Sequence, residues 1–400
     1  MSFVLFDLSD ELIFQILLQL ENVQVSAWHM SGVCTRTEAL LRGVGGRKLW
    51  STFYAAANRF NAAPRAGAGY ADKGARILEH MRFHFARYKV QAVSLSALAD
   101  HPAGQDIGTT LGLATDLRTL CLANFRCSPR WLGNGLVGLT GLTALELSQN
   151  QLIRDSQGDL HLPPSLLTLK MRSCGLRGFR LEGWAGQLGC VTTVDFSRNE
   201  CSTDQTNIAA VVAAMAKLCS ANLSNMGLQP AVLTAVVGAC ARLPGLRNLS
   251  VAYNMPNMTW MQDEKTAMMA ELARCTALEE LSLACLFVNN GAQQLANALR
   301  ALPALTALDL THCALGGFSW YVADALTALQ ALRLCSVSDC RIERADVPRF
   351  GIALAQCPAL ERVWVSDNAH DFHVPEVHAL GARVEYAQQP IAGTVCARFA

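Results

Sequence analysis

One eleven-residue pattern recurs along most of this chain and constrains its fold more than any other feature. Residues 142–152 read LTALELSQNQL, with leucine at positions 1, 4, 6 and 11 and asparagine at position 9. The alternation around position 5 puts Leu145 and Leu147 on one face of a strand and Glu146 on the other. The amide at position 9 can turn inward and bond backbone groups where the chain leaves the strand. The pattern therefore predicts a short strand followed by an inward-facing polar turn.

The same pattern occurs ten times, at spacings of 24 to 32 residues. Such recurrence predicts a solenoid, in which each repeat adds one strand to a parallel sheet. Between residues 329 and 342 a frame starting at Leu329 also fits. The frame starting at Leu332 is preferred because it puts Cys340 at position 9 and Ile342 at position 11. Positions 1, 4 and 6 are, in chain order, Leu117-Leu120-Leu122, Leu142-Leu145-Leu147, Leu166-Leu169-Met171, Val191-Val194-Phe196, Leu218-Ala221-Leu223, Leu246-Leu249-Val251, Leu278-Leu281-Leu283, Leu305-Leu308-Leu310, Leu332-Cys335-Val337 and Leu360-Val363-Val365.

Position 9 holds asparagine in some copies and cysteine in others, and both suit a buried site for a small polar or soft side chain. Val90, Val93 and Leu95 follow the start of the pattern and predict a degenerate first strand. The position-9 residues are Asn150, Asn199, Asn254 and Asn368, and Cys174, Cys313 and Cys340.

These repeats resemble the leucine-rich-repeat family. The resemblance implies an α/β solenoid of the ribonuclease-inhibitor-like kind over residues 90–400, with a parallel concave sheet and with helices and loops on the convex side. The segments before residue 205 are shorter and richer in glycine and proline, so loops or single helical turns are expected there. Later linkers have helical apolar spacing, which predicts helices at 208–218, 231–243, 265–275, 291–302 and 347–357.

Composition narrows the environment and the partners. The chain has 400 residues, 51% of them hydrophobic and 16% charged, with a net charge of +1. This balance gives no reason to expect nucleic acid or a membrane surface as a partner. Fifteen cysteines without a CxxC pair are expected to be reduced core thiols. Acidic residues occupy the place of a signal peptide's apolar segment, so a cytoplasmic, possibly nuclear, location is predicted.

Residues 1–54 do not follow the repeat and predict a small helical module. Ser9 can cap a helix, and Leu12, Ile16 and Leu20 lie on one stripe of it. Such a small unit has more apolar surface than it can bury alone, which favours a partner or docking on the solenoid. Residues 55–89 are expected to form a linker and a capping helix.

The N-terminal module resembles an F-box, a three-helix module that binds the Skp adaptor of cullin–RING ubiquitin ligases. Matching pieces are 8–12 (LSDEL), 33–36 (VCTR) and 49–50 (LW). Ser9 stands where the family usually has proline, Thr37 where an aromatic residue is common, and 43–46 is a glycine-rich insertion. The resemblance implies adaptor binding through Leu8, Leu12, Ile16, Leu20, Val33, Cys34 and Trp50.

An F-box followed by leucine-rich repeats implies the substrate-recognition subunit of such a ligase. The Skp-type adaptor and cullin complex would be partners, and the concave face would hold a client protein. One alternative stays open, a non-catalytic scaffold in a large assembly, whose N-terminal helices only cap the solenoid.

No catalytic, metal or cofactor site is expected, so the chain is not expected to be an enzyme. His80 and His84 share one helix face but lack a completing ligand. No local signature singles out a cysteine nucleophile.

Partner binding is therefore expected on the concave face, at positions 3, 5, 7 and 8. Arg, Tyr and Trp supply most interface energy, and Trp364 at position 5 is expected to be exposed. Arg172 and Arg198 leave neighbouring strands and predict contact with an acidic or phosphorylated client segment. Ser282 at position 5 is expected to face solvent. The candidate client-binding residues are Lys170, Arg172, Arg198, Tyr253 and Trp364.

Overall fold

A computed structural model describes most of the repeat region. Residues 1–51 of the predicted F-box-like module 1–54 lie outside the described residues, as do His80, His84 and most of the linker at 55–89. The described residues are 52–56, 78–79, 81–83, 85–86, 89–96, 104–124, 132, 135–150, 161–176, 185–199, 201, 207–254, 261–286, 291–366, 368 and 384–385.

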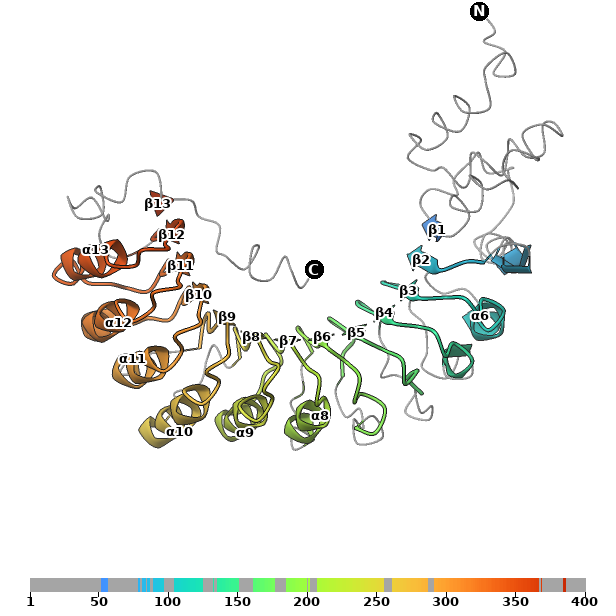
Figure 1. The fold of residues 1–400 in the computed structure, drawn as a ribbon, viewed down its shortest axis with the longest axis horizontal. Helices are drawn as coiled ribbons and strands as arrows, with labels where there is room; N and C mark the ends of the chain where they lie inside the picture. The colour runs from blue at the N-terminus through green and yellow to red at the C-terminus, as the bar shows by residue number, and fades with distance from the viewer. Residues whose placement is uncertain are drawn as a thin grey trace, which may run out of the picture. The chain divides into compact units, whose positions relative to one another are not determined.

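The chain divides into two compact units, residues 1–166 and 167–400. In the first unit, four strands pair in parallel and in chain order (Figure 1). Helix α6 (Gly104–Leu111) connects β2 to β3. The strands are β1 (Thr52–Ala56), β2 (Ala92–Ser96), β3 (Thr119–Cys121) and β4 (Ala144–Glu146).

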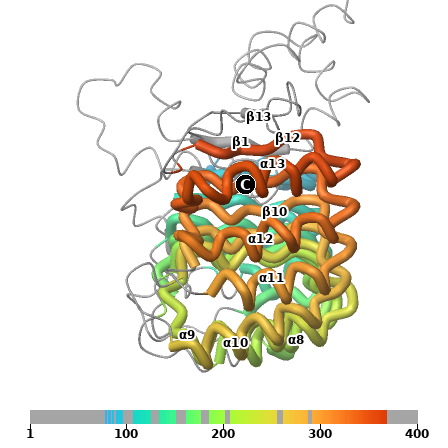
Figure 2. Tube along the Cα trace, turned by 90° about the vertical axis from the view of Figure 1, so that its left-hand side faces the viewer, coloured from blue at the N-terminus to red at the C-terminus, as the bar shows by residue number. Residues whose placement is uncertain are grey.

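The second unit repeats a strand, a turn and, from α8 onward, a helix. Its strands are parallel and adjacent in chain order, and the helices lie on the outer side of the strands (Figure 1). Figure 2 shows α10 to α13 stacked in chain order. The strands are β5 (Thr168–Lys170), β6 (Thr193–Asp195), β7 (Ser220–Asn222), β8 (Asn248–Ser250), β9 (Glu280–Ser282), β10 (Ala307–Asp309), β11 (Leu334–Ser336), β12 (Arg362–Trp364) and β13 (Val384–Glu385). The helices are α8 (Ile208–Ala214), α9 (Pro230–Cys240), α10 (Gln262–Leu272), α11 (Ala292–Arg300), η3 (Gly316–Phe318), α12 (Ser319–Leu326) and α13 (Val347–Ala355).

The core confirms the predicted repeat register. Residues at positions 1, 4 and 6 of all ten copies are at most 3% exposed. Position 4 of one repeat pairs with position 4 of the next, as Leu281 does with Leu308 and Leu308 with Cys335. The latter pairing confirms the frame that starts at Leu332. The chain is a leucine-rich-repeat solenoid, as predicted.

The asparagines at position 9 bond the turns of adjacent repeats together. Asn199 Nδ2 donates to the carbonyls of Met171 and Phe196 at 2.7 and 2.6 Å, and its Oδ1 accepts the N–H groups of Cys174 and Leu176 at 2.8 and 3.3 Å. Asn254 and Asn368 make the same four contacts one or more repeats along. The inward amide expected from the sequence is confirmed, because Asn199, Asn254 and Asn368 each satisfy four backbone groups next to the core.

Cysteine at position 9 replaces only part of this network. The Cys340 thiol donates to the Leu310 carbonyl at 2.9 Å, and the Cys313 thiol to the Leu283 carbonyl at 3.3 Å. A thiol offers no acceptor equivalent to the amide oxygen. The position-9 N–H of the preceding repeat therefore bonds within its own turn, as that of Cys313 does to Leu310 at 3.1 Å.

Position 8 adopts a left-handed backbone conformation in nine consecutive copies, and this conformation aims successive position-8 side chains alike. In the copies other than that of Gln149, the turn stabilises this conformation, because the position-8 N–H donates to the position-7 carbonyl of the next repeat. The φ angles lie between 50° and 62° at Asn124, Gln149, Ser173, Arg198, Asn225, Tyr253, Cys285, His312 and Asp339.

Some elements differ from the expectation. The five predicted linker helices are present as α8, α9, α10, α11 and α13, each ending two to four residues earlier. Helices α6 and α12 were not expected, and α6 is longer than a single turn. Strand β1 spans residue 54, the predicted boundary between the helical module and the linker, and it starts the sheet before residue 90. Strand β2 confirms the predicted degenerate first strand.

Candidate interaction surface on the inner side of the second unit

Three of the predicted residues gather at one end of the second unit. Lys170 ends β5, Arg172 follows it at position 7, and Arg198 stands at position 8 of the next repeat. Lys170 and Arg172 are half-buried, whereas Arg198 is exposed. We call these three residues the basic corner. The register pairs Lys170 with Asp195 directly across the strands.

Asp195 is 4% exposed and belongs to the floor of the inner side. Its Oδ1 accepts the backbone N–H of Ser197 at 2.9 Å. Asn222, one repeat along, accepts the N–H of Ser224 in the same way at 3.2 Å. In these two repeats, the position-5 side chain therefore bonds to the backbone of position 7 instead of projecting into solvent.

The expectation that Ser282 faces solvent is wrong. Ser282 is completely buried, and its hydroxyl donates to Asp309 Oδ2 at 2.9 Å. Position 5 does lie on the face opposite positions 4 and 6, as predicted. The side chains there are short, and neighbouring strands lie only ~4.8 Å apart, so adjacent position-5 groups contact each other and exclude water.

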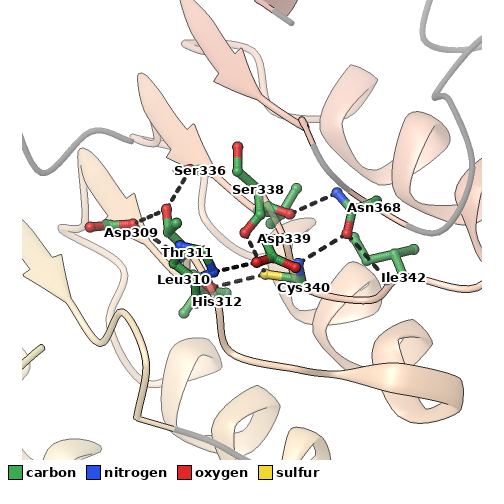
Figure 3. A network of polar contacts seen from close by, with 11 residues as sticks. Asp309, Leu310, Thr311, His312, Ser336, Ser338, Asp339, Cys340, Ile342 and Asn368 are labelled. Carbon is green, nitrogen blue, oxygen red and sulfur yellow. Dashed lines mark hydrogen bonds and ion pairs between the residues drawn. The ribbon is translucent and has the colours of Figure 1, made fainter. Parts of the chain in front are cut away.

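Asp309 is the centre of a polar network on β9 to β11 (Figure 3). Its Oδ1 accepts both the N–H and the hydroxyl of Thr311, at 3.0 and 2.6 Å. The Thr311 hydroxyl has one proton, which goes to Asp309, so Ser336 must donate in the 2.9 Å contact between the Thr311 and Ser336 hydroxyls. Ser282 on β9 and Thr311 in the turn after β10 therefore donate three hydrogen bonds to one buried carboxylate, which stabilises its charge.

The rim beside this network carries a side-chain hydrogen bond between neighbouring repeats. His312 Nδ1 contacts Asp339 Oδ2, and both side chains are partly exposed (Figure 3). Cys285 lies at the same position one repeat earlier. Burial raises the pKa of the Cys285 thiol to about 11; Asp309 and Asp339 add to the rise, and a hydrogen bond with Tyr253 opposes it. Such a thiol is protonated near neutral pH and is a weak nucleophile.

The expectation that Trp364 is exposed is wrong. The residue is 5% exposed and packs against Ala307, with Leu334 beside them. Ala307 and Leu334 occupy position 3 of the two preceding repeats, so the indole lies back across the sheet. Trp364 thus packs against its neighbours on the inner side and presents little surface to a partner.

The five candidate client-binding residues do not form one patch. Lys170, Arg172 and Arg198 lie together, Tyr253 is half-buried at the rim beyond β8, and Trp364 lies on β12. Sequence reasoning missed the Asp309 network. The sequence feature that could have revealed it is an aspartate at position 5, Asp309, with Ser282 and Ser336 at position 5 of the repeats on either side and Thr311 at position 7 of its own repeat.

Across the described ranges, His, Cys, Asp and Glu side chains form no group of three or more that could hold a metal ion. The cysteines in these ranges have free thiols. None of the helices described here is long and apolar enough to cross a membrane.

Comparisons with known proteins identify similar solved structures. No family model matches the sequence, and a search of the curated proteins finds no match. The chain is similar to the crystal structure of a TLR13–ssRNA13 complex, with a TM-score of 0.48 and 20% identity, over 72% of this chain and 37% of that one. It therefore spans well under half the length of that protein.

Two bacterial structures are also similar. The leucine-rich repeat-containing protein LegL7 from Legionella pneumophila has a TM-score of 0.43 and 17% identity, over 66% of this chain and 89% of that one. An internalin (inlF) from Listeria monocytogenes has a TM-score of 0.43 and 14% identity, over 79% of this chain and 96% of that one. The leucine-rich-repeat fold is established by the chain's own repeats and hydrogen bonds. It does not rest on the similarity to these structures.

Proposed function

We propose that this chain is a substrate receptor of a cullin–RING ubiquitin ligase. Residues 1–54 would bind a Skp-type adaptor, and the inner side of the solenoid would hold the client protein. The observation that carries the proposal is the order of an F-box-like segment followed by in-register repeats. The chain itself would supply proximity and orientation for ubiquitin transfer rather than groups that make or break bonds.

The repeat architecture supports a role in holding a partner. Each repeat presents side chains of positions 3, 5, 7 and 8 at nearly constant spacing, and the hydrogen bonds of the position-9 residues fix the turns behind them. A pre-organised surface loses less conformational entropy when a partner binds. A client protein rather than nucleic acid or a membrane is proposed as that partner.

Adaptor capture tests the proposal. The full chain with Leu12→Ala and Ile16→Ala should lose binding to a Skp-type adaptor, because truncating central apolar anchors costs ~2 kcal/mol or more each. A matched variant, Leu113→Ala with Val137→Ala, shortens two exposed apolar side chains of the repeat region and should bind normally. Failure of the native chain to bind the adaptor would refute the ligase role.

A scaffold role remains the second candidate, and one observation favours it. Strand β1 begins at Thr52, within the predicted module 1–54, and pairs in parallel with β2, so the chain is part of the repeat sheet from residue 52 onward. A helical cap that seals the first strand would connect in this way. The same capture experiment separates the two functions, because a cap has no reason to bind the adaptor.

A further inference from the structure

We propose that Cys190 and Lys217, which we call the thiol–amine pair, form a modification site that takes acyl thioesters as its substrate. The Cys190 thiol accepts the acyl group, and the Lys217 amine then takes it from the sulfur and keeps it as an amide. The inference goes beyond the proposed function, because it rests on the start of two strands in the second unit and needs no partner protein.

The two residues occupy the same place in neighbouring repeats. Each immediately precedes position 1 of its repeat, which is Val191 after Cys190 and Leu218 after Lys217. The turns into both strands are alike, because the position-1 N–H donates to the carbonyl three residues earlier, at 3.0 Å for Val191 and 2.9 Å for Leu218. The strands that follow, β6 and β7, pair in parallel. The two side chains therefore start ~5 Å apart on neighbouring strands.

The two side chains meet across this gap. Lys217 Nζ donates a hydrogen bond to Cys190 Sγ at 3.9 Å. The backbone beside the lysine is fixed, because the N–H groups of Cys219 and Ser220 both donate to the Thr192 carbonyl, at 2.8 and 3.0 Å. The sheet itself thus holds the amine next to the thiol, and no further loop has to close to bring them together.

Both side chains can be reached from solvent. Lys217 is exposed, and Cys190 is half-buried. A Cβ added at Gly189, next to the thiol in sequence, would meet nothing within 4 Å, so the space there is open. Gly245 stands at the equivalent place of the next repeat and adds no side chain beside Lys217. A small acyl donor can therefore approach the pair.

A second thiol near the lysine is bonded differently. Cys219 is exposed, and its thiol donates to the Lys217 carbonyl at 3.4 Å. Its sulfur therefore bonds a backbone oxygen, whereas the sulfur of Cys190 accepts from the side-chain nitrogen. Cys219 is for this reason a matched control for the role given to Cys190.

A thiol beside an amine divides the acylation of lysine into two easier steps. First, the Cys190 sulfur attacks the carbonyl carbon of a thioester. The new S–C bond forms at Cys190, the donor's C–S bond breaks, and the departing thiol takes up the proton that Cys190 loses. Second, the neutral Lys217 amine attacks the same carbon. The C–N bond forms, the Cys190 S–C bond breaks, and one amine proton passes to the sulfur. The products are an amide at Lys217 Nζ and the restored thiol, so no oxidant or further reagent is required.

Proximity is the contribution of the fold to this reaction. The carbon of an acyl group on Cys190 lies one covalent bond from the sulfur that Lys217 Nζ contacts. Attack within one molecule replaces an encounter between two, and this raises the rate of well-oriented pairs by several orders of magnitude. The lysine side chain is flexible, so a smaller gain is expected here. An amide is more stable than a thioester, so the transfer runs from sulfur to nitrogen.

Incubation of the full chain with acetyl-CoA tests the proposal, with the acetylation of each lysine followed by peptide mass spectrometry. Lys217 should be acetylated at least about tenfold faster than Lys89, an exposed lysine of the first unit. Cys190→Ser should slow acetylation of Lys217 to the rate of Lys89. Equal rates for the two lysines in the native chain, or an unchanged Lys217 rate in the variant, overturns the proposal.

A second variant and a second reagent are the controls. Cys219→Ser removes an exposed thiol two residues from the lysine and should leave acetylation of Lys217 unchanged. The N-hydroxysuccinimide ester of acetic acid acylates amines directly and should modify Lys217 equally in the native chain and in Cys190→Ser. A loss caused by Cys219→Ser overturns the assignment to Cys190. A slower reaction of the ester with Cys190→Ser shows that the substitution only changed access to Lys217, and it also overturns the proposal.

Lys217→Arg reveals the intermediate. Arginine keeps the positive charge but stays protonated, so it does not accept the acyl group. Acetyl groups should then accumulate on Cys190 as a thioester that hydroxylamine removes, and fewer should remain there in the native chain. The absence of a hydroxylamine-sensitive acetyl group on Cys190 in this variant overturns the proposal, whatever the outcome of adaptor capture.

Discussion

The Ser282 hydroxyl donates a hydrogen bond to Asp309 Oδ2 at 2.9 Å, and neither residue is exposed to solvent. This pair lies on the side of the sheet that faces away from the leucine core. The solenoid therefore contains a second, polar packing layer on its inner side. The polar side chains of this layer therefore contribute to the stability of the fold, and replacing them should change the free energy of unfolding.

Ser282→Ala should destabilise the second unit by ~1–3 kcal/mol, because it leaves the Asp309 carboxylate with one donor fewer in a buried place. Chemical denaturation of the full chain measures the change. The control is Gln293→Ala, at an exposed site on α11, which should be nearly neutral. Equal stability of the Ser282 variant and the native chain would mean that the polar layer is not structural.

Leu283→Ala and Leu310→Ala should each destabilise the fold by roughly 2–5 kcal/mol, the usual result of truncating a buried leucine. Both residues are completely buried at position 6. Thermal or chemical denaturation would show the loss. Effects below ~1 kcal/mol at both sites would contradict the assigned core register.

Asn199→Ala should destabilise the fold more than Cys340→Ala. The asparagine variant leaves four buried backbone groups without their partner, a cost on the order of 3 kcal/mol or more. The cysteine variant removes a weaker thiol donor to one carbonyl at its 2.9 Å contact. Denaturation midpoints of the two variants decide the order, and the reverse order would contradict the role given to the amide.

Alkaline pH should weaken the fold through its buried thiols. Burial raises the pKa of Cys201, Cys285 and Cys357 to about 11, above the ~8.5 of an exposed thiol. The folded state then holds protons that the unfolded state releases, so stability is full below pH ~8.5 and falls as pH rises through about 11. Denaturation between pH 7.5 and 10.5 would show the fall. It should be smaller for Cys285→Ser, and an identical fall in both proteins would exclude Cys285 as a contributor.

Thiol labelling should separate exposed from buried cysteines. Cys219 is exposed, whereas Cys313 and Cys340 are completely buried. Iodoacetamide should modify Cys219 in the native protein and reach the other two only after unfolding. Mass spectrometry of the labelled peptides checks this. Early modification of Cys313 would show that the turns of the repeats open readily.

The repeat pattern predicted the architecture because the core positions of each strand are determined by the sequence of that strand alone. Alternation around position 5 decides which face of each strand is apolar, and the 24-to-32-residue recurrence implies that the strands stack in parallel. The inward orientation of asparagine at position 9 could be predicted in the same way, since the backbone groups of a buried turn must find hydrogen-bond partners wherever the turn occurs. Helix α12 was not predicted, although its sequence, SWYVADAL, buries Val322, Ala323 and Leu326.

The solvent exposure of individual side chains on the inner side could not be predicted from the sequence of a single repeat. Ser282 and Trp364 have the position of surface residues, but their burial depends on side chains 27 to 57 residues away in sequence, namely Asp309 for the serine and Ala307 and Leu334 for the tryptophan. By itself, the sequence determined which residues form the core, in what register the strands pair, and which cations start from adjacent repeats. Only the tertiary structure decided which inner-side groups contact solvent, because exposure is set by the size and bonding of neighbours that the solenoid brings within ~5 Å.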